Sequence, residues 1–86
     1  MMSENIDKQV LELAASFLKA DVAELSPESA AGDLPQWDSF AHANLVMEFE
    51  RQFEVTFDVE DVLEMVTLGD IAVTLRRMKA SAGAGS

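Results

Sequence analysis

Apolar residues recur every three or four positions near the start of the chain, and this spacing places them on one side of a helix. Ser3 stands just before the stripe and is a suitable N-cap for this first helix. The stripe consists of Ile6, Val10, Leu13, Ala14, Phe17 and Leu18. The chain is therefore expected to open with an amphipathic helix that must bury one face against other elements.

The helical spacing is lost over residues 19–37, which are expected to form a long connection. Pro27, Gly32 and Pro35 all lie in this stretch and argue against regular structure. A connection of this length in a small domain is often functional. Four apolar side chains are expected to hold it on the core: Val22, Leu25, Leu34 and Trp37.

A second helix is predicted from residue 38 or 39 to about residue 53, with Asp38 as its N-cap. At 100° per residue, its core-facing side carries five residues: His42, Leu45, Val46, Phe49 and Phe53. A second, narrower apolar strip on this helix consists of Phe40, Ala43 and Met47. Burial against the core does not explain that strip.

Residues 54–57 are expected to form a short extended link, and a short third helix follows it with Asp58 as its cap. Its apolar residues have helical spacing: Val59, Val62, Leu63 and Val66. The fourth helix is predicted to begin at a variant of the capping box in which Thr67 is followed three residues later by Asp70. Its apolar side carries Leu68, Ile71, Ala72, Leu75 and Met78.

These elements predict an all-α fold, a small bundle of three long helices and one short third helix, with a long loop between helices 1 and 2. Residues 1–79 are assigned to one helical domain. Three basic residues near the end of the fourth helix, Arg76, Arg77 and Lys79, suit the negative C-terminal end of a helix dipole. Residues 80–86 are small and Gly-rich, so we expect a flexible C-terminal tail.

Charge narrows the possible functions further. The 86 residues carry a formal net charge of −10. Residues 33–70 hold ten acidic residues against a single base, Arg51. A nucleic-acid-binding protein needs the opposite sign to neutralise phosphates, and an anionic membrane surface is disfavoured for the same reason. The expected partner is a protein with a basic patch.

The remaining composition points to a single cytoplasmic domain. No apolar run approaches the roughly 20 residues needed to span a bilayer, and the N-terminus lacks the basic start and apolar run of a signal peptide. The chain contains no cysteine, so disulfides and thiol catalysis by its own side chains are excluded. We expect a monomer that neither inserts into membranes nor binds nucleic acid.

A catalytic or metal site is not visible in the sequence. The chain has a single histidine and no cysteine, and no group of carboxylates has the spacing of a metal loop. The acidic stretch after Asp58 fails as a calcium loop because Leu63 stands where glycine is required. There is no G-x-S-x-G motif. His42 is predicted to be a hydrogen-bonded structural histidine near the start of the second helix.

What remains is the Gln-Trp-Asp-Ser-Phe segment over residues 36–40. Ser39 is expected at the first position of a helix, where free backbone N–H groups and the dipole favour an anion. On its own, this arrangement is read more simply as Asp38 capping the helix and Ser39 filling its first turn. The rest of the sequence favours an attachment site at Ser39 over this simpler reading.

The chain resembles the acyl carrier protein family over about residues 4–79. The resemblance is carried by Asp38-Ser39-Phe40, by the run from Leu45 to Glu50 and Phe53, and by Thr-Leu-Gly-Asp-Ile over residues 67–71. The layout of a helix, a long loop, Asp-Ser opening the second helix and a short acidic third helix is similar too. The resemblance implies that Ser39 carries 4′-phosphopantetheine, taken from coenzyme A by a separate Mg²⁺-dependent transferase.

By the same resemblance, the chain is no enzyme but a freestanding carrier of acyl or aminoacyl groups, held as thioesters on that arm. Its partners are then the phosphopantetheinyl transferase and the acyl-activating, synthase or transferase enzymes that present basic patches. The resemblance places the partner-binding surface beside Ser39. It comprises Asp38, Phe40, Ala43, Met47, Glu48, Glu50, Glu54, Glu60, Asp61 and Glu64.

Several positions depart from the pattern of fatty-acid carriers. Phe40 replaces the usual Leu or Met, Ala41 and Asn44 occupy places where further acids are common, and Arg51 interrupts the acidic run. These departures favour a specialised pathway over housekeeping fatty-acid synthesis. The alternative function is an acidic helical interaction module without a prosthetic group, which would simply dock a basic partner.

Overall fold

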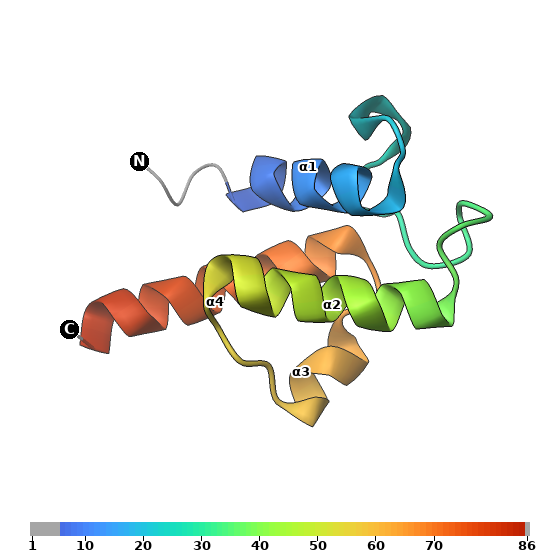
Figure 1. The fold of residues 1–86 in the computed structure, drawn as a ribbon. Coiled ribbons are helices and arrows are strands. Elements are labelled where there is room, and N and C mark those ends of the chain that lie inside the picture. The colour runs from blue at the N-terminus through green and yellow to red at the C-terminus, as the bar shows by residue number, and fades with distance from the viewer. Residues whose placement is uncertain (1–5, 86) are drawn as a thin grey trace.

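The computed structural model describes residues 6–85, with side chains described for residues 6–79. It contains α1 (Ile6–Leu18), the short 3₁₀ helix η2 (Val22–Glu24), α2 (Ser39–Phe53), α3 (Val59–Glu64) and α4 (Leu68–Gly85). The predicted all-α bundle with a short third helix is confirmed (Figure 1). The predicted N-cap Ser3 lies outside the described residues.

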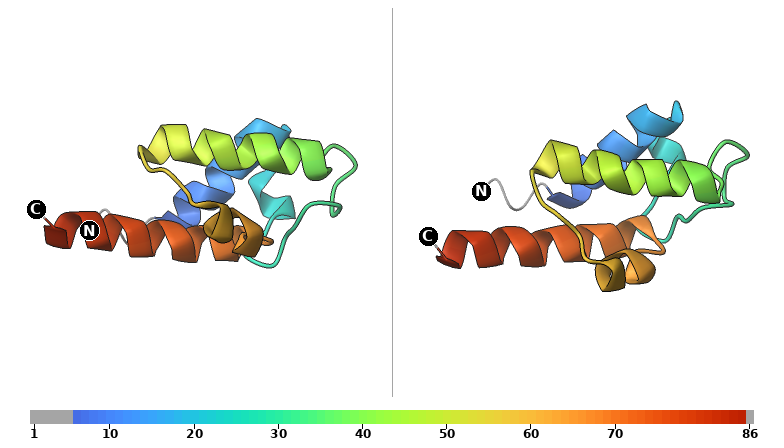
Figure 2. Two further views of the ribbon diagram at one scale, coloured as in Figure 1. Left: turned by 90° about the horizontal axis from the view of Figure 1, so that it is seen from below. Right: turned by 60° about the horizontal axis from the view of Figure 1, so that its bottom comes forward.

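Three apolar helix faces meet in one core. α2 and α4 form a pair of long helices, with α1 on one side of the pair and α3 on the other (Figure 2). The predicted stripes of α1, α2 and α4 supply most of the buried side chains, and Phe49, Leu45 and Leu75 are fully enclosed. Phe17 belongs to the predicted stripe of α1 but is 37% exposed. The neighbouring elements cover a narrower face of α1 than the one that the spacing of apolar residues predicts.

The third helix is confirmed, but its apolar stripe is not a core face. Val59 and Leu63 are 75% and 73% exposed, and Val66 is exposed as well. The contacts with the core come instead from the residues flanking the helix, because Phe57 and Met65 are both buried. α3 is therefore a short helix that is anchored to the core by the residues before and after it, and its outer surface is apolar.

The long connection between α1 and α2 is more ordered than its composition indicates. Asp21 caps η2 by accepting a hydrogen bond from the backbone N–H of Ala23, a turn that the sequence analysis did not predict. Leu25 and Trp37 are buried and Leu34 is half-buried, as expected of anchors. The prediction for Val22 is wrong, since its side chain is 43% exposed.

The connection is also fastened to the start of α4. The backbone N–H groups of Leu68 and Gly69 donate to the carbonyls of Ser29 and Pro27 at 3.0 and 2.8 Å. An isolated antiparallel bridge joins Ala30 to Thr67. These bonds satisfy N–H groups that the first turn of a helix leaves free. A Cβ at Gly69 would lie 3.0 Å from the Pro27 carbonyl oxygen, so glycine permits this close approach.

The basic residues of α4 are bound to the other three helices. Arg76 pairs with Asp7 of α1, Arg77 pairs with Asp61 just inside α3, and Lys79 donates to the carbonyl of Phe53 at the end of α2. The expectation that these cations interact with the C-terminal end of their own helix is corrected, because α4 continues to Gly85. The boundary between a domain at 1–79 and a flexible tail at 80–86 stays a prediction.

The start of α4 is closed by the predicted capping box. The Thr67 hydroxyl accepts from the backbone N–H of Asp70, and the Asp70 carboxylate accepts from the N–H groups of Thr67 and Val66 at 3.0 and 3.2 Å. The hydrogen bond from the Thr67 backbone is the main cause that lowers the pKa of Asp70 below its ordinary value of 3.8. The ionised form of this carboxylate is therefore favoured by folding.

We predict that Asp70→Asn destabilises the protein more at neutral pH than in acid. Because the folded-state pKa is lowered, the stabilisation is present above the ordinary pKa and is lost as pH falls through the lowered value. The measurement is urea unfolding of wild type and Asp70→Asn between neutral pH and about pH 2. The difference in free energy of unfolding should shrink in acid, and a difference independent of pH would contradict the assignment.

Candidate functional site

Ser39 occupies the first position of α2 and is exposed to solvent. Asp38 precedes it in an extended conformation and accepts a hydrogen bond from the backbone N–H of Ala41 at 2.8 Å. The side chain of the cap is thus committed to the helix, while the hydroxyl of Ser39 faces outward. Neighbouring N–H groups of the first turn create a local positive potential, which suits a phosphate ester at this position.

Residues 37–39, called the corner below, lead from the connection into α2. The burial of Trp37 fixes the backbone of this corner. Its side chain is 0% exposed, although it lies only two residues before Ser39. Its carbonyl accepts from the N–H of Gly32 at 2.6 Å, and its own N–H donates to Leu34 at 3.0 Å. Gly32 adopts a φ of 101°, a region that favours glycine. The corner is therefore a tight turn in which Trp37 is buried and Ser39 is exposed.

His42 behaves as the structural histidine that the sequence predicted. Its Nδ1 accepts from the indole Nε1 of Trp37 at 3.1 Å, and its Nε2 lies 2.8 Å from the carbonyl oxygen of Met65. Both ring nitrogens are thus engaged within the fold. The imidazole lies on the side of α2 that faces the core, where it is half-buried.

The second apolar strip of α2 lies on the surface beside Ser39. Phe40 is 78% exposed, Met47 is 55% exposed, and Ala43 is exposed between them. Large apolar side chains at such exposure are unusual on one helix face and mark an interaction surface when they cluster. The structure therefore leaves this strip uncovered, next to the serine.

Apart from Asp38, which caps α2, the acidic residues of the predicted partner surface fall into two groups. Glu48 bonds to Arg51 and Gln52, Glu50 accepts from the backbone N–H of Phe57 at 2.7 Å, and Asp61 pairs with Arg77. The hydrogen bond from Gln52, with that from Arg51, lowers the pKa of Glu48. The other acids, Glu54, Glu60 and Glu64, are exposed, and we find no ion pair for them among residues 6–79.

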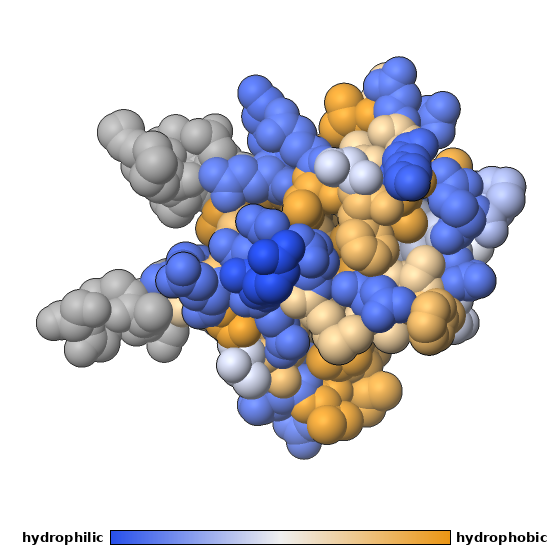
Figure 3. All heavy atoms as spheres, in the orientation of Figure 1, coloured by the Kyte–Doolittle hydropathy of each residue, from blue (hydrophilic) through white to orange (hydrophobic). Residues whose placement is uncertain are grey.

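The exposed apolar residues of α3 were missed as candidate surface residues. The space-filling view shows hydrophobic side chains gathered over this helix (Figure 3). In the sequence, their helical spacing is the same as that of a core stripe, so periodicity alone gave no warning. The available signal was the high density of acids between them, Glu60, Asp61 and Glu64, which is costly to place near a core.

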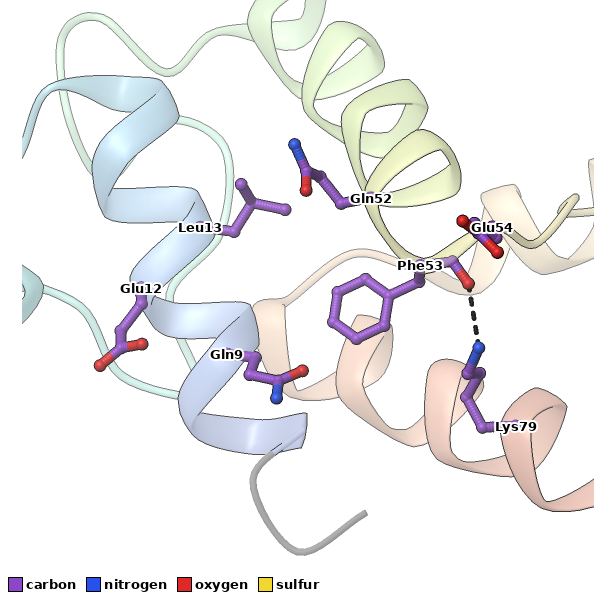
Figure 4. A pocket seen from close by; sticks show the side chains of 7 residues that line it. All are labelled: Gln9, Glu12, Leu13, Gln52, Phe53, Glu54 and Lys79. Atoms are coloured by element: carbon purple, nitrogen blue, oxygen red, sulfur yellow. Dashed lines mark hydrogen bonds between the residues drawn. The ribbon is translucent and has the colours of Figure 1, made fainter. Parts of the chain in front are cut away.

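A cleft of about 500 Å³ lies at the opposite end of α2 from Ser39 (Figure 4). The Phe53 ring and Leu13 form its apolar part, and Lys79 closes one side by its bond to the Phe53 carbonyl. At a rise of about 1.5 Å per residue, Phe53 is roughly 20 Å along the helix from Ser39. Ser39 is therefore not part of this cleft and is exposed at the other end of the helix.

Other kinds of site have little support in the described part of the chain. Among those residues, no group of three or more His, Asp or Glu side chains is placed to hold a metal ion. No helix within them is long and apolar enough to cross a membrane. The exposed serine at the capped start of α2 is thus the best-defined chemical group that the fold presents.

The helical bundle and its exposed serine are compatible with the class of carrier domains, and comparison with known proteins shows that the chain belongs to this class. The family model described as "Phosphopantetheine attachment site" matches residues 8–75. A protein named "Acyl carrier protein" from an Exiguobacterium species is 34% identical over 71 residues, covering 83% of this chain and 90% of that protein. The chain therefore belongs to the acyl carrier protein family.

Two further relatives carry the same name at lower identity. The "Acyl carrier protein" of Desulforapulum autotrophicum is 27% identical over 74 residues, or 85% of this chain and 96% of that one. The one from Porphyromonas gingivalis is 29% identical over 69 residues, covering 80% and 87%. These matches confirm the resemblance to the acyl carrier protein family that the sequence indicated. The members of this family are carriers rather than catalysts.

We predict that the two residues of the corner differ in their effect on stability. Asp38→Ala removes the N-cap bond to Ala41 and should lower the free energy of unfolding by about 1 kcal/mol. Ser39→Ala removes an exposed hydroxyl and should change it by less than about 0.5 kcal/mol. Chemical unfolding of both variants measures this. A large loss in Ser39→Ala would mean that its hydroxyl is a structural cap.

Proposed function

We propose that Ser39 is the attachment site of 4′-phosphopantetheine and that the chain is a freestanding carrier of acyl or aminoacyl groups. The observation that carries this proposal is the exposed Ser39 hydroxyl at the Asp38-capped start of α2, in a chain whose family model is named for phosphopantetheine attachment. The free first-turn N–H groups suit the phosphodiester. When bound, the thiol of the arm carries the cargo as a thioester.

In the proposed modification, a phosphopantetheinyl transferase supplies both the general base and the metal ion. The oxygen of Ser39 forms a new ester bond to the phosphorus next to the pantetheine, and the pyrophosphate bond of coenzyme A breaks. The adenosine 3′,5′-bisphosphate portion leaves, and the hydroxyl proton passes to the base of the transferase. Ser39 needs no activating neighbour of its own, which is consistent with its exposed position at the start of α2.

The proposed cargo pathway is a specialised one in the cytoplasm rather than housekeeping fatty-acid synthesis. The support lies in the surface around Ser39. Phe40 presents a large exposed ring directly after the serine, and Asn44 bonds back to the Phe40 carbonyl where an acid is common. Arg51 neutralises Glu48 by an ion pair. The surface that partners meet is therefore more apolar and less acidic than the sequence count implies.

We predict that the unmodified protein gains the mass of one 4′-phosphopantetheinyl group when it is incubated with coenzyme A, Mg²⁺ and a broad-specificity transferase. Intact-mass measurement detects the gain. Ser39→Ala is the matched control and should fold normally but remain unmodified.

No gain in the wild-type protein would count against the carrier function and favour the acidic interaction module. An equal gain in Ser39→Ala would show that the attachment residue is a different one. The Ser39→Ala result is interpretable because the side-chain cap of α2 is supplied by Asp38, and Ser39 itself is exposed.

The proposed partner surface combines the Phe40–Ala43–Met47 strip with the acids of α2 and α3. We assign the charge attraction mainly to Glu54, Glu60 and Glu64, which are exposed, whereas Glu48, Glu50 and Asp61 are engaged within the fold. The engaged acids still contribute to the negative field at longer range. Weak, charge-steered contacts suit a carrier that must leave each enzyme it visits.

We predict that the triple variant Glu54→Gln, Glu60→Gln, Glu64→Gln slows association with the transferase by about tenfold at low salt. The matched control, Glu12→Gln, Glu24→Gln, Glu28→Gln, removes the same charge from exposed positions on α1, η2 and the connection. Stopped-flow association rates measure the effect. It should fade at high salt because screening removes the attraction. Equal slowing in both triple variants would mean that only net charge matters.

A further inference from the structure

A continuous hydrogen-bond bridge begins two residues before Ser39 and runs from the connection through α2 to the end of α3. The indole Nε1 of Trp37 donates to Nδ1 of His42, and Nε2 of His42 lies 2.8 Å from the Met65 carbonyl oxygen. The two rings are 5.9 Å apart and tilted by 33°. Trp37 and Met65 are both buried, so this bridge is shielded from competing water at both ends.

The partners fix the hydrogen positions on the imidazole. An indole N–H can only donate, so Nδ1 of His42 must accept. A carbonyl oxygen can only accept, so Nε2 must carry the hydrogen. The bridge therefore requires the neutral Nε2–H tautomer of His42. Both hydrogen bonds then donate in the same direction, from Trp37 to His42 and from His42 to Met65. A side chain replaces His42 in this role only if it offers an acceptor and a donor side by side.

The bridge spans the two backbone segments that determine where the Ser39 hydroxyl lies. Trp37 is the residue before the cap, and His42 is three residues after Ser39 on the first turn of α2. Met65 is the C-cap of α3 and is followed at once by the capping box of α4. The corner is thus tied to the α3–α4 junction as well as to its own helix.

We infer that Trp37 and His42 are positioning residues for the modification of Ser39, acting through the Trp37–His42–Met65 bridge that holds this corner in one orientation. The inference rests on the proposed function. Trp37 is fully buried and His42 is half-buried on the core-facing side of α2, so we expect their effect to act through the backbone on which Ser39 is presented. A transferase that meets one fixed orientation avoids the cost of ordering the corner on binding.

The test compares His42→Phe with His42→Gln. Phenylalanine keeps a ring but removes both hydrogen bonds, whereas a glutamine amide offers an acceptor and a donor. We expect His42→Phe to lower kcat/KM for phosphopantetheinylation by roughly tenfold or more. The loss should appear mainly as a raised KM, since only the fraction of molecules with the correct orientation binds productively. His42→Gln should retain most of the wild-type kcat/KM.

A remote core variant separates positioning from general destabilisation. Val10→Ala truncates a buried residue of α1, far from the corner, and should lower stability without changing kcat or KM well below the melting temperature. If His42→Phe does not fold, Trp37→Phe removes the indole donor while keeping an aromatic ring, and the same loss in kcat/KM is expected of it.

A spectroscopic measurement reports the bridge independently of modification. The chain has one Trp and one His, so the indole N–H and imidazole resonances each arise from a single residue. The imidazole nitrogens should show the neutral Nε2–H tautomer, and the indole N–H resonance should shift in His42→Phe and return towards wild type in His42→Gln.

Three results would overturn the inference. The first is an unchanged kcat/KM in His42→Phe or its substitute Trp37→Phe, and the second is a His42→Gln variant as impaired as His42→Phe. The third is an imidazole that carries its hydrogen on Nδ1. Failure of the proposed function itself is a different outcome, because then the wild-type protein gains no mass at all.

Discussion

The burial of Trp37 beside an exposed serine is the constraint on which the rest of the structure depends. An aromatic side chain of this size removes on the order of 200 Å² from water when enclosed, which is worth several kcal/mol at about 25 cal/mol per Å². The chain turns outward immediately afterwards, and Asp38 starts α2 with a side-chain cap. The strongest local anchor in the connection therefore lies two residues before Ser39, the residue that the proposed function requires to be accessible.

The charged side chains also fall into two sets. Some bond one helix to another, and others are exposed at the surface. A chain with a net charge of −10 must limit self-repulsion, and the basic residues of α4 do this by binding α1, α3 and the end of α2. Acids that are engaged in this way stabilise the bundle. The acids left on the outer side of α2 and α3 are exposed beside apolar side chains that the core does not cover, and together they form the proposed partner surface.

Local signals in the sequence predicted where α2, α3 and α4 begin, whereas the candidate serine depended on the resemblance of the wider chain to a known family. Asp38, the Asp58–Asp61 capping box and the pair Thr67 and Asp70 each act within one helical turn, so these helix starts could be predicted from spacing. Relations between distant segments could not. The Arg77–Asp61 pair and the contact of His42 with Met65 depend on how α3 and α4 fold back on the rest.

The outer face of α3 shows why periodicity has a limit. Helical spacing tells which side chains share a face, but it does not tell whether another element covers that face. Val59 and Leu63 share a face with no cover, while Phe57 and Met65, outside the stripe, reach the core. The exposure of the apolar strip on α2 could be anticipated because a second, covered face already accounted for the burial of that helix.

The most direct test of this account is a comparison of amide and indole N–H spectra of the protein before and after phosphopantetheinylation. If the hydroxyl is presented on a rigid, pre-formed corner, resonances near Ser39 and along the exposed strip should shift while the Trp37 indole resonance stays in place. A large shift of that indole resonance, with changes spread through the core, would contradict the account, because attachment would then require the fold to rearrange.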